Sequence, residues 1–87
     1  MTERQVVVGH RLGVHARAAA RLVQLSSQYQ SSIVLCRCDP EADLQADARS
    51  ILSILLLAAR QGSTLVVRAN GVDENEAVER ICEYLRG

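Results

Sequence analysis

A histidine stands where a glycine turn leads into an alanine-rich segment, in the stretch "GVHARAAARL" (13–22). The histidine is His15, and Arg17 follows two residues later. A neutral imidazole has a ring nitrogen that can attack an electrophile. A guanidinium fork binds phosphate oxygens through paired hydrogen bonds. If a phosphoryl group were transferred to His15, Arg17 could therefore stabilise its negative charge.

The local structure expected around His15 supports this chemistry. Apolar residues recur at three and four positions from Ala16 to about residue 27, which predicts an amphipathic helix that begins directly after the histidine. The first amides of a helix, here those of Ala16, Arg17 and Ala18, lack partners within the helix and attract anions. The helix dipole and Arg17 both disfavour a second positive charge, so we expect a largely neutral imidazole.

Three other interpretations of His15 are open from the residues alone. A histidine at a helix start is often only a capping or surface residue, since short motifs have many false positives. A metal site is less favoured, because His10 is the only other histidine and no acid or cysteine lies at ligand spacing. A hydrolytic triad lacks an acid placed to orient the imidazole.

Composition limits the functional classes. The chain has 87 residues, enough for one domain (1–87) with a single core. Ten basic residues, all arginine, balance ten acidic ones and form no basic run, so we expect no nucleic-acid partner. No segment is long enough to span a membrane and no signal peptide is apparent, so we expect a cytoplasmic protein without membrane insertion.

The hydrophobic pattern predicts seven elements in the order βαββαβα. Strands are expected at 4–8, 31–38, 44–48 and 63–69, and helices at 16–27 and 50–62. A turn followed by a last helix is expected within 70–87. The second helix should be capped by Ser50 and end at Gly62. The segment "DPEAD" (39–43) should form the turn of a hairpin. The predicted fold is an α/β (α+β) open-faced sandwich, with a four-stranded antiparallel sheet and three helices on one face.

The three cysteines should be reduced thiols. Cys36 and Cys38 lie two residues apart on one predicted strand, so they share the face opposite Leu35, which we expect to be the open face. Two such ligands without companions make a poor metal site, so we expect no metal. Cys82 falls in the apolar stripe of the last helix and should belong to the core.

The stretch "GVHARAAA" resembles the active-site signature of the HPr family of phosphocarrier proteins. The resemblance extends over the element order, to "RSIL" (49–52) and to "GVDENEAVERI" (71–81). It implies that His15 accepts a phosphoryl group on Nδ1 from phosphorylated Enzyme I, which draws on phosphoenolpyruvate, and passes it to a IIA protein. Arg17 would contact the phosphate. The protein would be a relay component, not an enzyme, and would need no cofactor.

One position departs from the family signature, because Ala18 stands where proline is usual. Alanine keeps the helix and adds one N–H donor, so we expect phosphorylation to be retained. The sequence "HARAAA" looks more like the nitrogen-related branch, often called NPr, than the sugar-transport branch. A small interaction module of the same fold, never phosphorylated, is the alternative function.

The resemblance also implies a partner surface and a second phosphorylation site. Six apolar residues between Ile51 and Leu57 are too many for one buried stripe, so some should face a partner. By family position, Leu52 and Leu55 would join Ala16 and Ala20 around His15. Ser50 is the N-cap, and in some family members a serine at this place is phosphorylated by a dedicated HPr serine kinase.

Overall fold

The computed structural model describes residues 1–39 and 42–87, in the element order β1 (Thr2–Val7), α1 (Ala16–Ser26), β2 (Ser32–Asp39), β3 (Ala42–Asp47), α2 (Ile51–Leu56), β4 (Thr64–Asn70) and α3 (Glu74–Arg86). The predicted βαββαβα order is therefore confirmed. Most strand limits differ from the prediction by one or two residues. Pro40 and Glu41, which belong to the segment predicted as a turn, lie outside the described residues, as do the side chains of Cys38, Asp39 and Ala42.

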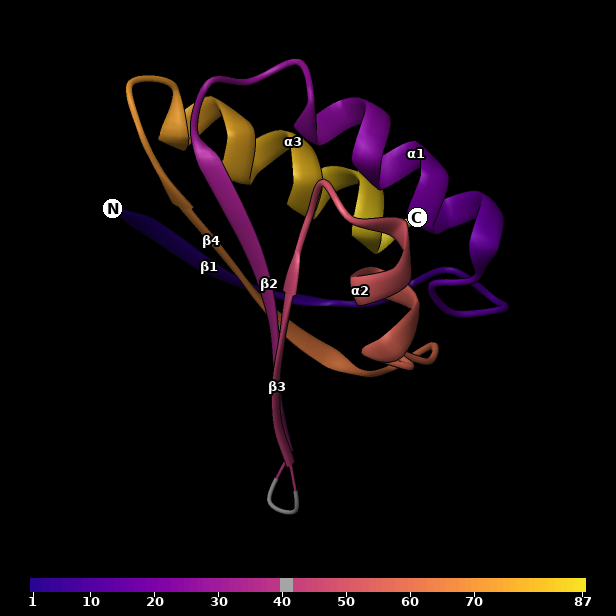
Figure 1. Ribbon diagram of the computed structural model, residues 1–87. Coiled ribbons are helices and arrows are strands. Elements are labelled where there is room, and N and C mark those ends of the chain that lie inside the picture. Colours follow the sequence, from indigo (N-terminus) through magenta and orange to yellow (C-terminus); the bar gives the residue numbers. More distant parts are fainter. Residues whose placement is uncertain (40–41) are drawn as a thin grey trace.

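All strand pairs in the sheet are antiparallel, in the order β1-β4-β2-β3. The predicted hairpin is confirmed by the pairing of β2 with β3. Figure 1 shows α1 and α3 side by side over one side of this sheet, with α2 below α1. The three helices and one face of the sheet enclose a single cluster of buried aliphatic side chains. This is the predicted open-faced sandwich.

The second helix is shorter than predicted. It ends at Leu56, and the αL position that usually takes glycine is occupied by Ala58, with a φ of 50°. Arg37 of β2 explains this early end, because its guanidinium donates to the carbonyl oxygens of Leu57 and Ala58. The prediction that Gly62 caps this helix is wrong. Gly62 lies in the turn before β4, where its amide donates to the Val8 carbonyl at 2.8 Å.

The cysteines are only partly as predicted. Cys82 is fully buried in the core, as expected, and burial raises the pKa of its thiol. Cys36 lies on the strand face opposite Leu35, yet it is only 2% exposed. The expectation that it faces water is wrong, because β2 is a central strand and Gln45 and Val66 flank the thiol from both neighbouring strands. The described residues contain no cluster of metal-ligating side chains.

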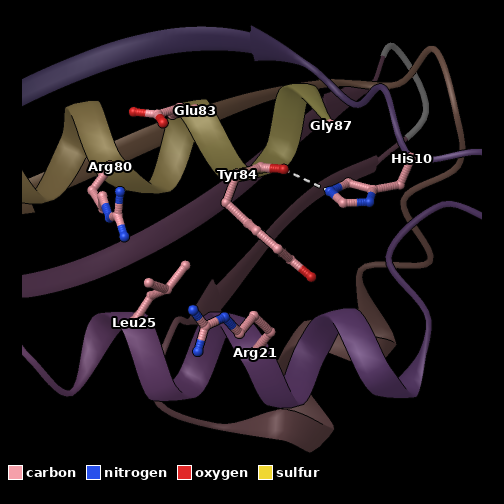
Figure 2. Close-up of a pocket in the computed structure, with 7 residues that line it drawn as sticks. All are labelled: His10, Arg21, Leu25, Arg80, Glu83, Tyr84 and Gly87. Atoms are coloured by element: carbon pink, nitrogen blue, oxygen red, sulfur yellow. Dashed lines mark hydrogen bonds between the residues drawn. The ribbon is translucent and has the colours of Figure 1, made fainter.

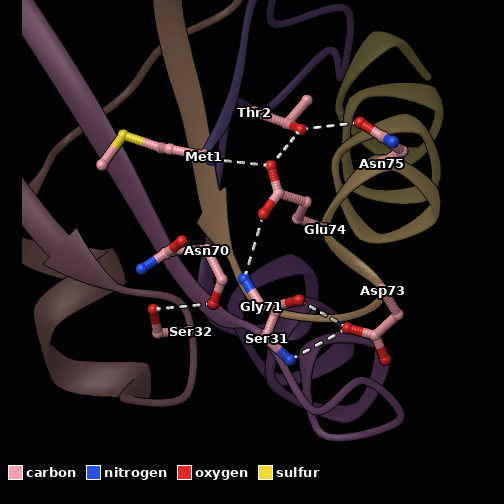
Figure 3. A network of polar contacts seen from close by, with 9 residues as sticks. All are labelled: Met1, Thr2, Ser31, Ser32, Asn70, Gly71, Asp73, Glu74 and Asn75. Carbon is pink, nitrogen blue, oxygen red and sulfur yellow. Dashed lines mark hydrogen bonds and ion pairs between the residues drawn. The ribbon is translucent and has the colours of Figure 1, made fainter.

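Two carboxylates fix the start of α3 to distant parts of the chain (Figure 3). Asp73 accepts hydrogen bonds from the Ser31 hydroxyl at 2.5 Å and from the Gln30 and Ser31 amides at 2.8 and 2.9 Å. These bonds lower the pKa of Asp73, the Ser31 hydroxyl having the largest effect. Glu74 accepts from the Thr2 hydroxyl at 2.6 Å and from the Gly71 amide at 3.2 Å.

The Glu74 contacts predict a dependence of stability on pH. The Thr2 hydroxyl bond is the main cause that lowers the pKa of Glu74 from 4.5 to about 2, with the Met1 amino group and the Gly71 amide adding to it. A folded-state pKa below the unfolded value stabilises the fold at neutral pH, and this contribution disappears as the pH falls through about 5 to about 2.

We therefore expect Glu74→Gln to be less stable than the parent protein at pH 7, with the difference shrinking toward pH 2. Urea unfolding at a series of pH values measures it. Glu79→Gln, an exposed change on the same helix, serves as the control. A Glu74→Gln difference that stays constant across this pH range would contradict the role assigned to the carboxylate.

Candidate functional site

His15 caps the N-terminus of α1, at the end of the loop that follows β1. Its Nδ1 atom accepts a hydrogen bond from the Arg17 amide at 3.2 Å. An accepting Nδ1 carries a lone pair and no proton, so the neutral tautomer compatible with this bond has its proton on Nε2. His15 therefore does act as an N-cap, which was one of the alternatives open from the sequence. This capping bond directs Nδ1 at the helix N-terminus.

The first turn of α1 offers fewer open amides than the sequence predicted. The Arg17 amide is taken by Nδ1, whereas the amides of Ala16 and Ala18 have no hydrogen-bond partner among residues 1–39 and 42–87. The expectation of three open donors is wrong for the unmodified state, because the imidazole satisfies one of them. A group bonded to Nδ1 would remove the lone pair that accepts from Arg17 and so return this amide to the site.

The side chains around His15 leave room for an incoming group. His15 is half-buried, and Ala16 and Arg17 are exposed. The Arg17 guanidinium makes no hydrogen bond or ion pair with the residues that the structure describes. Ala18 lies in the first helical turn at 2% exposure, so the helix forms with alanine at this position, as predicted.

The loop that carries His15 is held by the segment after α2. The Val14 amide donates to the Ala59 carbonyl at 3.0 Å. Gly13 has a φ of 71°, and a Cβ at this position would lie 2.5 Å from the Ala59 oxygen. Only glycine meets both conditions without strain. The sequence showed a glycine turn, but nothing in it indicated that Ala59 is the partner.

The predicted partner residues lie on α1 and α2, which pack against each other. Within α2, Ile54 is buried while Ile51, Leu52 and Leu56 are exposed, with 68% exposure for Leu52. Leu55 is half-buried and packs on the core, so it is less open than expected. Ala20 is half-buried on α1. The expectation that not every apolar residue of this helix is buried is confirmed.

The predicted N-cap of α2 is confirmed. The Ser50 hydroxyl accepts a hydrogen bond from the Ser53 amide at 3.2 Å, and Ser50 is half-buried. Sequence reasoning missed the preceding residue, Arg49. Its guanidinium donates to the carbonyl oxygens of Ser26, Tyr29 and Ser31 at 3.2, 2.6 and 3.0 Å. Arg49 thereby fixes the end of α1, and no local pattern marks such a contact.

His10 lies in the loop between β1 and α1, as expected. Its Nε2 atom donates to the Tyr84 carbonyl near the end of α3 at 2.6 Å, and the two rings pack with centroids 4.8 Å apart. The only other histidine therefore has a structural role. No helix in the described part of the chain is long and apolar enough to cross a membrane.

Comparison with known proteins gives consistent results. A family model described as "PTS HPr component phosphorylation site" matches residues 2–86. Phosphocarrier protein HPr of Xylella fastidiosa (strain 9a5c) is 41% identical over 95% of this chain and 89% of its own length. Phosphocarrier protein NPr of Proteus mirabilis (strain HI4320) is 37% identical over 90% of this chain and 83% of its own length.

The fold is also similar to solved structures. The crystal structure of HPr-C-His from Thermoanaerobacter tengcongensis aligns with a TM-score of 0.85 and 30% identity. The alignment covers 98% of this chain and 91% of that one. At this identity and coverage, the likeness extends to the whole arrangement of sheet and helices.

Proposed function

Since the chain belongs to the HPr family of phosphocarrier proteins of the phosphotransferase system, we propose that His15 is the residue that carries the phosphoryl group. The protein is a phosphocarrier in this relay and not an enzyme. We further propose that residues 1–87 act as one phosphocarrier domain, since the family match covers 2–86 and the buried side chains form one cluster.

The observation that carries this proposal is the direction of the His15 ring. Its Nδ1 lone pair faces the first turn of α1, where the amides of Ala16 and Ala18 are open. In the transfer step, this lone pair forms a bond to phosphorus, and the donor's nitrogen keeps the electron pair of the broken N–P bond. The proton on Nε2 stays in place throughout, so no separate base is required.

The new negative charge would be stabilised by groups already in position. The open amides and the helix dipole favour an anion at this end of α1. The exposed Arg17 side chain has no competing partner among the described residues, so its guanidinium can turn toward the phosphate. The Arg17 amide, released by loss of the Nδ1 lone pair, would add a donor only in the phosphorylated state.

The proposed partners are Enzyme I as donor and a IIA protein or domain as acceptor, which are the partners implied by the family. We place the relay in the cytoplasm, where phosphoenolpyruvate is made. The test is incubation with Enzyme I and phosphoenolpyruvate, followed by intact mass measurement. We expect an acid-labile gain of one phosphoryl group. No gain would favour the alternative, an interaction module that is never phosphorylated.

We propose that the exposed apolar side chains of α2, Ile51, Leu52 and Leu56, form the surface that both partners contact. Exposed leucine and isoleucine side chains gathered on one short helix form an apolar patch, and such patches mark sites where a partner binds. Ser50, whose hydroxyl accepts from the Ser53 amide, stands directly before α2, so a phosphate on it would add negative charge beside this surface. Modification by a serine kinase would thus oppose docking.

Leu52→Glu is expected to slow phosphoryl exchange with Enzyme I by about tenfold, the effect of losing one well-packed apolar contact. The fold should remain intact, because Leu52 is 68% exposed. The measurement is the initial rate of phosphohistidine formation at limiting Enzyme I, with circular dichroism to check folding. Leu55 is a poorer choice for this test, since it packs on the core.

Val72→Glu is the matched control for this prediction. It introduces the same charge at an apolar residue that is 85% exposed, but in the turn between β4 and α3. We expect a rate close to that of the parent protein. Equal slowing by both variants would mean that added charge, and not the surface on α2, sets the rate.

A further inference from the structure

A groove of about 340 Å³ lies between α1 and α3, apart from the residues assigned to phosphoryl transfer. Leu25 of α1 and Tyr84 of α3 provide its apolar surface. Arg21 and Arg80 line it from the same two helices. The volume falls within the range of pockets that bind small molecules.

The apolar surface of the groove is held in place before any ligand arrives. Leu25 is only 2% exposed, and Tyr84 packs against the core. The Tyr84 ring contacts the His10 ring at 4.8 Å between centroids, and the same histidine is hydrogen-bonded to the Tyr84 carbonyl. Figure 2 shows the Tyr84 hydroxyl pointing toward α1, which places a polar group beside the apolar surface.

Neither Arg21 nor Arg80 forms an ion pair with a carboxylate in the described part of the chain. Arg21 donates once, to the Gln24 side chain at 3.3 Å, and has further N–H groups. Arg80 makes no hydrogen bond or ion pair with any residue that the structure describes. In Figure 2 the Arg80 side chain extends from α3 toward α1, while Arg21 lies beside Leu25.

Glu76, Glu79 and Glu83 line a neighbouring pocket together with Arg80, but none of these carboxylates forms an ion pair with Arg21 or Arg80. Glu83 also lines the groove, but Figure 2 shows its carboxylate directed away from Arg21. Two guanidinium groups on one groove repel each other, and an anion between them would remove that repulsion. Guanidinium forks fit the oxygens of phosphate especially well, because each fork can donate two parallel hydrogen bonds.

We propose that this groove binds a small phosphate monoester with a flat apolar body. The two negative charges of the phosphate match Arg21 and Arg80. The apolar body would lie on the half-buried Tyr84 ring, with the buried Leu25 side chain behind it and the tyrosine hydroxyl available to a polar substituent. The proposal does not depend on the function assigned to His15, since none of the groove residues takes part in that chemistry.

The test is a titration of the whole protein with phenyl phosphate, followed by amide chemical shifts in NMR. We expect saturable shifts at Leu25, Arg80 and Tyr84. Arg80→Gln and Arg21→Gln should each weaken binding by about tenfold, the effect of one charge-assisted hydrogen bond. Arg86→Gln is the matched control, because this exposed arginine lies on the same helix outside the groove and should leave binding unchanged.

Two further titrations separate the parts of the proposal. Inorganic phosphate tests the charge alone, and phenol tests the apolar body alone; both should bind more weakly than phenyl phosphate. Equal binding of inorganic phosphate would overturn the role of Leu25 and Tyr84. Shifts centred on residues 16–18 that vanish in Arg17→Gln would place the anion at the start of α1, and the proposal would then be wrong.

Discussion

His15→Asn is expected to abolish acceptance of the phosphoryl group while preserving the fold. Asparagine is among the preferred N-cap residues, so its side-chain oxygen can accept the hydrogen bond that the Arg17 amide donates to Nδ1 in the parent protein. It has no nucleophilic ring nitrogen. The parent protein should gain one acid-labile phosphoryl group from Enzyme I and phosphoenolpyruvate, and the variant should gain none. Intact mass spectrometry distinguishes these outcomes directly.

Two more variants separate chemistry from stability at this position. His15→Ala removes both the nucleophile and the cap, so we expect no phosphorylation and a loss of about 1 kcal/mol in the free energy of unfolding. In a domain of this size, that loss lowers the melting temperature by about 4–8 °C. His10→Ala removes the other histidine and should still be phosphorylated. Phosphorylation of either His15 variant would exclude His15 as the carrier.

Gly9→Ala is expected to lower the free energy of unfolding strongly, although it adds only one methyl group. A Cβ at Gly9 would overlap the carbonyl oxygen of Arg86, at the end of α3. The Gly9 amide also donates to the Leu85 carbonyl at 2.9 Å, so the two backbones are already in direct contact. Neither backbone can yield without disturbing Leu85, which is fully buried. We expect a loss of about 3 kcal/mol, within the range for overpacked sites.

Gly62→Ala is the control that isolates steric overlap from backbone conformation. Gly62 has a φ of 89°, which disfavours alanine, but nothing lies within 4 Å of an added Cβ. Its expected loss is about 1 kcal/mol, from the left-handed conformation alone. Thermal unfolding of both variants measures the difference. A Gly9→Ala protein as stable as Gly62→Ala would show that the end of α3 moves aside easily.

Local sequence patterns were sufficient for the element order and for the main features of the site. Short β-branched or apolar runs marked most of the strands, alternation marked the strand at 44–48, and apolar residues at three- and four-residue spacing marked α1 and α3. His15 could be placed at a helix start because the alanine-rich segment begins at the next residue. Ser50 could be recognised as an N-cap, since a serine before a helix satisfies an open amide within three residues.

Contacts between distant segments could not be read in this way. The early end of α2 depends on Arg37, which comes from a strand some twenty residues earlier. The burial of Cys36 depends on which strands flank β2. The groove forms because α1 and α3 pack side by side in opposite directions, which brings Arg21 and Arg80 to line it together (Figure 1).

The sequence by itself determined that a histidine would stand at the start of a helix, within a βαββαβα sandwich, beside small residues and an arginine. Only the tertiary structure decided that Nδ1 points at the Arg17 amide, that Ala59 holds the loop through Val14, and that Leu52 is left exposed while Ile54 is buried. The reason is physical. Helix starts and strands arise from interactions between near neighbours, whereas ring orientation, burial and grooves depend on which segments the packed core brings together.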